Sequence, residues 1–107
     1  MLSNDAGMPV DFKSNGCGSG SFADFVPNTI YFLDITESCK IHDYAYLVGT
    51  TIEDKDKADR EFLNNMIRLI DAKEAWYYPH WFARRRALKY YEAVHTLGGS
   101  AFWDKEN

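Results

Sequence analysis

The stretch TESCKIHDYAYLVG, residues 36–49, decides the fold expected for this chain of 107 residues. It predicts a helix from about Glu37 to Val48. Thr36 is a suitable N-cap, and the carboxylate of Glu37 suits the first turn of a helix. Gly49 can end the helix, since glycine is common just past a helix C-terminus. The sequence around this stretch therefore places a helix of about three turns near the middle of the chain.

One face of this helix carries polar side chains where a core face would normally be apolar. Spacings of i, i+3, i+4 and i+7 bring four such side chains onto the same face: Cys39, His42, Asp43 and Tyr46. Burying these groups without partners would be costly. We therefore expect groups from other segments to pair with them.

Two further helices are expected after this one. Residues 52–73 carry apolar side chains every three or four positions, and Thr51 with Asp54 resembles a capping box. The short link at 49–51 makes the first two helices antiparallel neighbours. A third helix is expected over 80–97, ended by two glycines.

The whole chain, residues 1–107, is predicted to be a single, mostly α domain. Residues 1–15 are polar and expected to be loose. Residues 22–35 are aromatic and apolar but lack the alternation of a strand, so an irregular loop with a short turn is expected.

Composition and charge exclude some classes of function. A net charge of −4 argues against general nucleic-acid binding. No run of about 18 apolar residues could span a membrane. The first ten residues lack the basic and apolar regions of a signal peptide, so we expect export by another route or a leader missing from this sequence.

A carboxylate on the second helix is expected to face His42. Asp59 lies on the same stripe as Phe62 and could accept a hydrogen bond from one ring nitrogen, leaving the other nitrogen to act as a base. Asp56, one turn earlier in the charged run 53–57, is the competing candidate.

A glycine-rich loop, Gly-Cys-Gly-Ser-Gly-Ser at 16–21, precedes these helices. A bridge between Cys17 and Cys39, the two cysteines, would hold this loop against the first helix. Backbone carbonyls of the loop and the carboxylate of Asp43 would then form an oxygen-only site, which suits Ca²⁺. Free, buried cysteines are the alternative, and Cys39 beside His42 could then be a nucleophile.

These motifs resemble those of the secreted phospholipase A2 family. Residues 15–20, Asn-Gly-Cys-Gly-Ser-Gly, look like the family's calcium loop. Residues 38–46, Ser-Cys-Lys-Ile-His-Asp-Tyr-Ala-Tyr, look like its active-site helix, and residues 58–62 resemble the segment supplying the aspartate behind the histidine. The resemblance covers roughly residues 15–70.

The resemblance implies a fold, an activity and a role for each matching residue. The fold would have two long antiparallel helices carrying the active site, a calcium loop and a further C-terminal helix. His42 would activate a water molecule that attacks the sn-2 ester of a glycerophospholipid. Asp59 would orient His42, and Tyr46 would support Asp59. A second tyrosine, Tyr90 or Tyr91, could assist. Ca²⁺ and the Gly18 N–H would stabilise the oxyanion, with the ion held by Gly16, Gly18, Gly20 and Asp43.

The chain departs from the common family pattern in its cysteines. Most secreted members carry many disulfides, whereas this chain can form one, between Cys17 and Cys39. The minimal form resembles microbial or viral relatives. A secreted enzyme acting at a phospholipid surface is therefore the expectation, and the alternative is a membrane- or partner-binding module on the same scaffold without the chemistry.

A second motif lies near the C-terminus, where aromatic residues at 76–82 precede Arg84, Arg85 and Arg86. Such a pairing could dock on an anionic lipid surface. The expectation favoured from sequence is plainer: the aromatic side chains pack inward and the arginines stay solvated.

Overall fold

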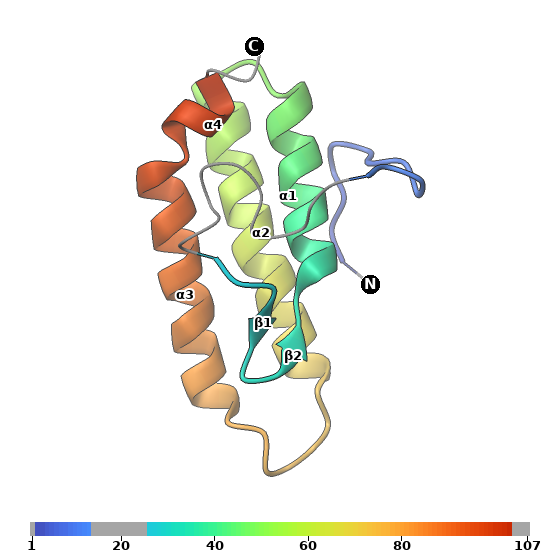
Figure 1. Ribbon diagram of the computed structural model, residues 1–107, viewed down its shortest axis with the longest axis vertical. Helices are drawn as coiled ribbons and strands as arrows, with labels where there is room; N and C mark the ends of the chain where they lie inside the picture. Colours follow the sequence, from blue (N-terminus) through green and yellow to red (C-terminus); the bar gives the residue numbers. More distant parts are fainter. Residues whose placement is uncertain (1, 14–25, 104–107) are drawn as a thin grey trace.

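The computed structural model of the chain describes residues 2–13 and 26–103. Within these ranges, three long helices run side by side, alternately up and down (Figure 1): α1 at Thr36–Val48, α2 at Ile52–Ala72 and α3 at His80–Leu97. A short helix, α4 at Gly99–Trp103, and a hairpin of β1 at Thr29–Ile30 and β2 at Leu33–Asp34 accompany them. The expected mostly α class is confirmed. None of the described helices is long and apolar enough to cross a membrane.

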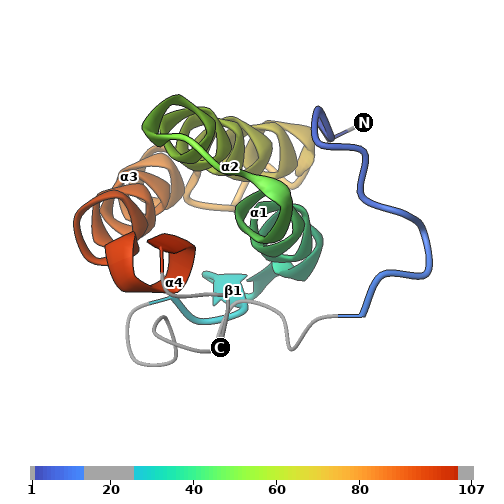
Figure 2. The same ribbon diagram turned by 90° about the horizontal axis from the view of Figure 1, so that it is seen from above.

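Helix α2 is the centre of the packing. It contacts α1 on one side and α3 on the other, while β1 and α4 lie across from it, as the view from above shows (Figure 2). The side chains of Phe62, Met66 and Ile70 on α2 are fully buried, together with Ile35 and Phe102 from the segments across from it. The apolar stripe that predicted α2 is therefore the stripe that fills the core.

The helix termini agree closely with the sequence, with one difference at α1. Thr51 and Asp54 form the expected capping box, in which the Thr51 hydroxyl accepts from the Asp54 N–H at 3.1 Å. The first helix begins at Thr36 itself, so the prediction of Thr36 as N-cap is wrong. The carboxylate of Asp34 instead accepts a hydrogen bond from the Thr36 N–H at 2.8 Å. Hydrogen bonds from the Thr36 side chain and from this N–H lower the pKa of Asp34.

The hairpin corrects the expectation of an irregular loop with a short turn at 22–35, because in the described part of this range two short strands flank the turn. Its strands pair antiparallel, Ile30 opposite Leu33, across a two-residue turn. Both turn residues, Tyr31 and Phe32, have positive φ values of 47° and 71°. Tight hairpin turns of this kind normally use Asn or Gly. The sequence has neither at these positions, so it gave no sign of the turn.

Helix α4 was also missed, because the glycines at 98 and 99 suggested only a stop. The structure turns at Gly98 and continues into α4, whose Phe102 packs over the α1–α2 turn. A Cβ at Gly49 would lie 2.8 Å from the Phe102 ring and 3.0 Å from the Ala45 oxygen. Glycine suits this turn because the Phe102 ring on α4 lies directly against it.

The N-terminal segment is held against α2 and is not loose where the structure describes it. The buried Asn65 side chain accepts from the Ser3 N–H at 2.7 Å and donates to the Ser3 carbonyl at 2.9 Å. Glu61 accepts from the Ser3 hydroxyl at 2.6 Å and from the Asp5 N–H at 2.9 Å. Two side chains of α2 thus take up backbone groups of residues 3–5 that would otherwise face water.

Candidate active site

The centre of the candidate site is a buried histidine–aspartate pair between α1 and α2. The Nε2 atom of His42 lies 2.8 Å from Oδ1 of Asp59. His42 is 3% exposed and Asp59 is fully buried. Of the two aspartates considered from sequence, the structure brings Asp59 to the histidine, whereas Asp56 lies beside His95, with its Oδ1 3.9 Å from Nδ1.

The hydrogen bond to Asp59 fixes which nitrogen of His42 carries a proton. An ionised carboxylate can only accept, so Nε2 must be the donor. In the neutral ring, Nδ1 then has the lone pair, and a base would act through that atom. The same geometry would stabilise the ring when Nδ1 gains a proton.

Three more side chains surround the Asp59 carboxylate. The hydroxyl of Tyr46 donates to Oδ1 at 2.6 Å, as the family resemblance implied. The ammonium of Lys55 lies 2.9 Å from Oδ2, and Nδ1 of His95 lies 3.3 Å from the same oxygen. Lys55 also donates to the backbone oxygen of His95 at 3.1 Å, which ties α2 to α3 at this point. The carboxylate is therefore fixed by side chains of all three long helices.

These contacts keep Asp59 ionised in spite of its burial. Burial by itself raises the pKa of this carboxyl. The hydrogen bond and the charge of the His42 ring, with the hydrogen bonds from Tyr46 and Lys55, outweigh burial and hold the pKa below its ordinary value. Burial and the bond to Asp59 raise the pKa of the Tyr46 phenol, which therefore stays neutral as a donor. Within the described residues, every buried side-chain polar atom has a partner.

The imidazole of His42 is also held by two aromatic rings. Its centroid lies 4.2 Å from that of Tyr46 and 4.8 Å from that of Phe62. Tyr46 comes from the next turn of α1 and Phe62 from the facing stripe of α2. The plane of the imidazole is therefore set by packing as well as by the hydrogen bond.

Sequence reasoning missed two of the groups around the aspartate. Lys55 stands in the charged run 53–57, a pattern that is typical of a solvated helix face. His95 is a lone histidine without a metal-binding motif beside it, so neither pattern assigns these side chains to the site. Neither proposed second tyrosine makes a described contact with the aspartate: the Tyr90 hydroxyl donates to the Thr29 carbonyl at 3.1 Å, and Tyr91 stacks on His95 at 5.4 Å. Lys55 lies one helical turn before Asp59, and this i, i+4 spacing was the available signal.

The expected calcium site lies only partly in the described chain. Asp43 is half-buried on α1, next to His42 in sequence. Cys39 is buried and disulfide-bonded. The loop residues predicted to complete the site and the bridge lie outside the described residues: Gly16, Cys17, Gly18 and Gly20.

The donor chemistry of these residues fits a hard cation. In the described chain, no group of three or more His, Cys, Asp or Glu side chains could hold a metal. The site that the resemblance implies at Asp43 would combine one carboxylate with backbone carbonyls, which are oxygen donors of the kind that Ca²⁺ takes.

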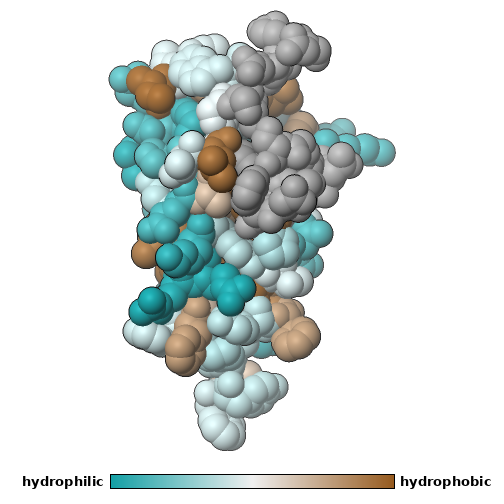
Figure 3. All heavy atoms as spheres, turned by 60° about the vertical axis from the view of Figure 1, so that its left-hand side comes forward, coloured by the Kyte–Doolittle hydropathy of each residue, from teal (hydrophilic) through white to brown (hydrophobic). Residues whose placement is uncertain are grey.

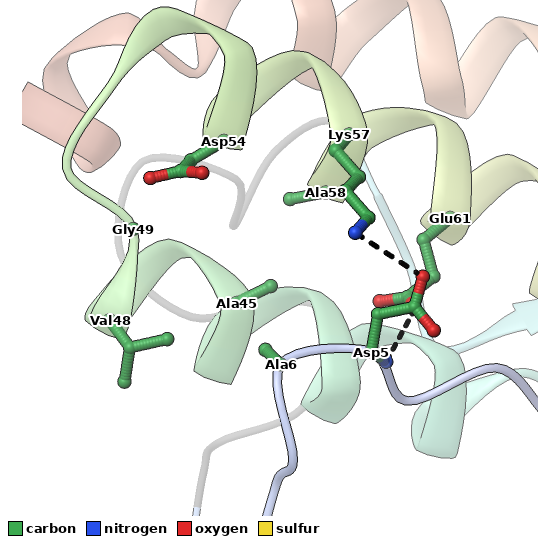
Figure 4. A pocket seen from close by; sticks show the side chains of 9 residues that line it. All are labelled: Asp5, Ala6, Ala45, Val48, Gly49, Asp54, Lys57, Ala58 and Glu61. Atoms are coloured by element: carbon green, nitrogen blue, oxygen red, sulfur yellow. Dashed lines mark hydrogen bonds and ion pairs between the residues drawn. The ribbon is translucent and has the colours of Figure 1, made fainter.

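A separate pocket of about 200 Å³ lies between the N-terminal segment and the α1–α2 turn. Ala45 and Ala58 line its floor, and the charged side chains of Asp5, Lys57 and Glu61 project around it (Figure 4). Neither the histidine nor the aspartate of the candidate site lines this pocket. Its charges pair with one another, as in the Lys57–Asp5 contact at 3.7 Å, so we do not assign it to the chemistry.

Comparison of the chain with models of protein families, with curated proteins and with solved structures found no match in any of the three.

Proposed function

We propose that this chain is a Ca²⁺-dependent hydrolase of the phospholipase A2 type, which cleaves the sn-2 ester of glycerophospholipids. The observation that carries the proposal is the buried pair in which His42 Nε2 lies 2.8 Å from Asp59, with Tyr46 on the same carboxylate oxygen. This pair supports a histidine base acting through Nδ1. The choice of a phospholipid ester as substrate and of Ca²⁺ as metal comes from the resemblance of residues 38–46 and of the glycine loop to motifs of secreted phospholipases A2.

The proposed reaction uses His42 first as a base and then as an acid. Nδ1 takes a proton from a water molecule, whose oxygen forms a bond to the ester carbonyl carbon. Asp59 stabilises the imidazolium that results, without taking its proton. As the ester C–O bond breaks, the proton on Nδ1 passes to the leaving alkoxide, which gives a free fatty acid and a lysophospholipid.

Ca²⁺, when bound by Asp43 and the carbonyls of Gly16, Gly18 and Gly20, would supply positive charge for the developing oxyanion. Asp43 contributes the only carboxylate of this set. An Asp43→Asn variant is therefore expected to lose the ion, because carbonyls without a carboxylate hold it weakly.

Fatty-acid release from phosphatidylcholine vesicles, with Ca²⁺ and with a chelator, tests the proposal. We expect release with Ca²⁺, none with chelator, and a loss on the order of 10³-fold in His42→Gln. His80→Gln is the matched control. The ring nitrogens of His80 lie 2.7 and 2.9 Å from backbone oxygens, and the ring packs on the Tyr78 ring at 5.2 Å, away from His42 and Asp59, so the variant should leave release unchanged. Full activity in His42→Gln would overturn the mechanism.

The two aspartates provide a second matched pair. Asp59→Asn should reduce release by a similar order, because an amide no longer enforces the tautomer with a proton on Nε2. Asp56→Asn should keep most of the activity, since Asp56 is half-exposed beside His95. If the wild-type chain binds vesicles but releases nothing in any condition, the non-enzymatic binding module becomes the better description.

A further inference from the structure

One end of the molecule presents large aromatic side chains to solvent. We call this surface the aromatic end and define it by side chains that are each more than half exposed: Phe32, Trp76, Tyr77, Trp81 and Phe82. They come from the β1–β2 turn, the α2–α3 connection and the start of α3, which share the lower end of the molecule (Figure 1). The expectation that the aromatic residues at 76–82 pack inward is therefore wrong for all but Tyr78.

The fold holds these segments together as one surface. The buried hydroxyl of Tyr78 donates to the Ile30 carbonyl at 2.6 Å, which ties the α2–α3 connection to the hairpin. The guanidinium of Arg86 lies 5.3 Å from the centroid of the Tyr31 ring, which ties the hairpin turn to α3. Within this frame Phe32 is fully exposed at a φ of 71°, a conformation that favours Asn or Gly. The fully exposed Phe32 ring buries no apolar surface in the fold, so it does not stabilise the fold by burial.

The same end is positively charged although the chain as a whole is acidic. Residues 73–86 contain four basic residues and one acidic residue, whereas the complete chain carries a net charge of −4. Arg84 pairs with Asp71, its Nη2 lying 2.6 Å from Oδ1, so the positive charge offered to a ligand rests mainly on Arg85 and Arg86. Arg85 lies 4.9 Å from the Trp81 ring centroid, so cations and aromatic rings alternate on the surface. Apolar (tan) and hydrophilic (teal) side chains indeed lie next to each other toward the lower end of Figure 3.

We propose that the aromatic end attaches the chain to an anionic phospholipid surface. Trp, Tyr and Phe side chains insert at the level of lipid headgroups, and arginines beside them are attracted to anionic lipids. Phe32 and Trp76 are 101% and 91% exposed, so their rings stand clear of the rest of the fold, which suits insertion into a lipid interface. This inference rests on the proposed function, which supplies phospholipid as the ligand. It concerns attachment of the chain to the lipid surface and not hydrolysis of the ester.

The test is co-sedimentation of the full chain with vesicles, in chelator so that hydrolysis does not contribute. Vesicles of phosphatidylcholine with a third of phosphatidylglycerol are compared with pure phosphatidylcholine. We expect binding to the anionic vesicles that weakens with added salt. The Phe32→Asn variant should bind about tenfold more weakly, because it loses a buried aromatic ring on the membrane. Replacing both Arg85 and Arg86 by Gln should weaken binding about twentyfold.

Phe32→Asn has a matched control and a built-in check on folding. Asn tolerates positive φ, so the variant should be at least as stable as the wild type in thermal unfolding. Val10→Asn removes another fully exposed apolar side chain, from the N-terminal segment, and should bind like the wild type. Equal binding by Phe32→Asn and Val10→Asn, or no preference for anionic vesicles, would overturn the proposal.

The outcomes also separate attachment from chemistry. Hydrolysis of a monomeric short-chain phospholipid should be unchanged in Phe32→Asn, because Phe32 is not part of the His42 site. Vesicle binding without any hydrolysis would retain this inference and overturn the proposed function. Hydrolysis without vesicle binding would retain the proposed function and overturn this inference. A complex with a protein partner that covers the aromatic end would count against lipid as the ligand of that end.

Discussion

Asp59 is the residue on which the candidate site depends, since its two oxygens face side chains from α1, α2 and α3. Such a buried carboxylate is stable only because hydrogen bonds and a cation compensate its loss of water. Lys55 supplies that cation at 2.9 Å and is itself 5% exposed. The support behind the histidine is thus one tyrosine, one lysine and one histidine, in place of the pair of tyrosines that the resemblance suggested.

Replacing Lys55 should reveal this dependence in the stability of the fold. We expect Lys55→Met to lower the free energy of unfolding by about 3 kcal/mol, because Asp59 loses a buried cationic partner. Lys57→Met is the control: its ammonium is exposed and lies 3.7 Å from Asp5, so its loss should cost less than about 1 kcal/mol. Urea denaturation measures both, and equal losses would contradict a special role for Lys55.

The depressed pKa of Asp59 also predicts how stability depends on pH. Its ordinary value is 3.8 and its value in the folded chain is lower. The ionised carboxylate therefore contributes stability that is fully present above pH 3.8 and is lost as pH falls through the folded-state pKa. The difference in unfolding free energy between wild type and Asp59→Asn should shrink on this acid side. A difference that stays constant with pH would show that the charge of Asp59 is not responsible.

At the scale of elements, the helices follow from local sequence, while their junctions depend on neighbours. The α1–α2 turn is an example, because Gly49 lies against Phe102 from α4. We expect Gly49→Ala to destabilise the fold by about 1–3 kcal/mol through overpacking.

Gly99→Ala is the matched control for this junction. A Cβ there would meet its nearest neighbour at 4.0 Å, which is ordinary contact. Thermal unfolding should therefore shift for Gly49→Ala only. If both variants unfold like the wild type, α4 does not pack tightly over the turn.

At the scale of the whole molecule, the N-terminal segment closes one side of the α1–α2 pair. Asn65, fully buried on α2, both accepts from and donates to the backbone of Ser3. Asn65→Ala should cost about 1–3 kcal/mol, since it leaves these groups without their partner. It should also speed hydrogen exchange at the Ser3 amide.

The exposed neighbour Asn64 provides the comparison. Asn64→Ala removes the same type of side chain from the same helix without touching Ser3, and should leave both exchange and stability nearly unchanged. Identical exchange at Ser3 in the two variants would mean that the segment is held by other contacts.

The whole-molecule view also separates two candidate surfaces. The histidine pair lies between the midsections of α1 and α2, whereas the aromatic end lies at the start of α3 and the hairpin turn (Figure 1). Attachment and chemistry would then depend on different residues of one small domain, which is why their tests can be read independently.

The sequence by itself determined the three long helices and the candidate pair. The apolar stripe of α2, the Thr51 capping box and the spacing from Cys39 to Tyr46 are local patterns, and local patterns dictate helices and the faces they present. Placing Asp59 on the apolar stripe was enough to prefer it over Asp56.

Only the tertiary structure decided what surrounds that pair and what remains exposed. His95 meets Asp59 because α2 and α3 pack together, and such a contact leaves no periodic trace in the chain. Lys55 is one turn from Asp59 on α2, but the burial of its ammonium depends on the His95 carbonyl that α3 brings to it. The hairpin turn at Tyr31 and Phe32 has no glycine to mark it, and the aromatic residues after 75 look like core residues until their neighbours are known. These features depend on partners distant in sequence, whose positions are fixed by packing and not by local propensity.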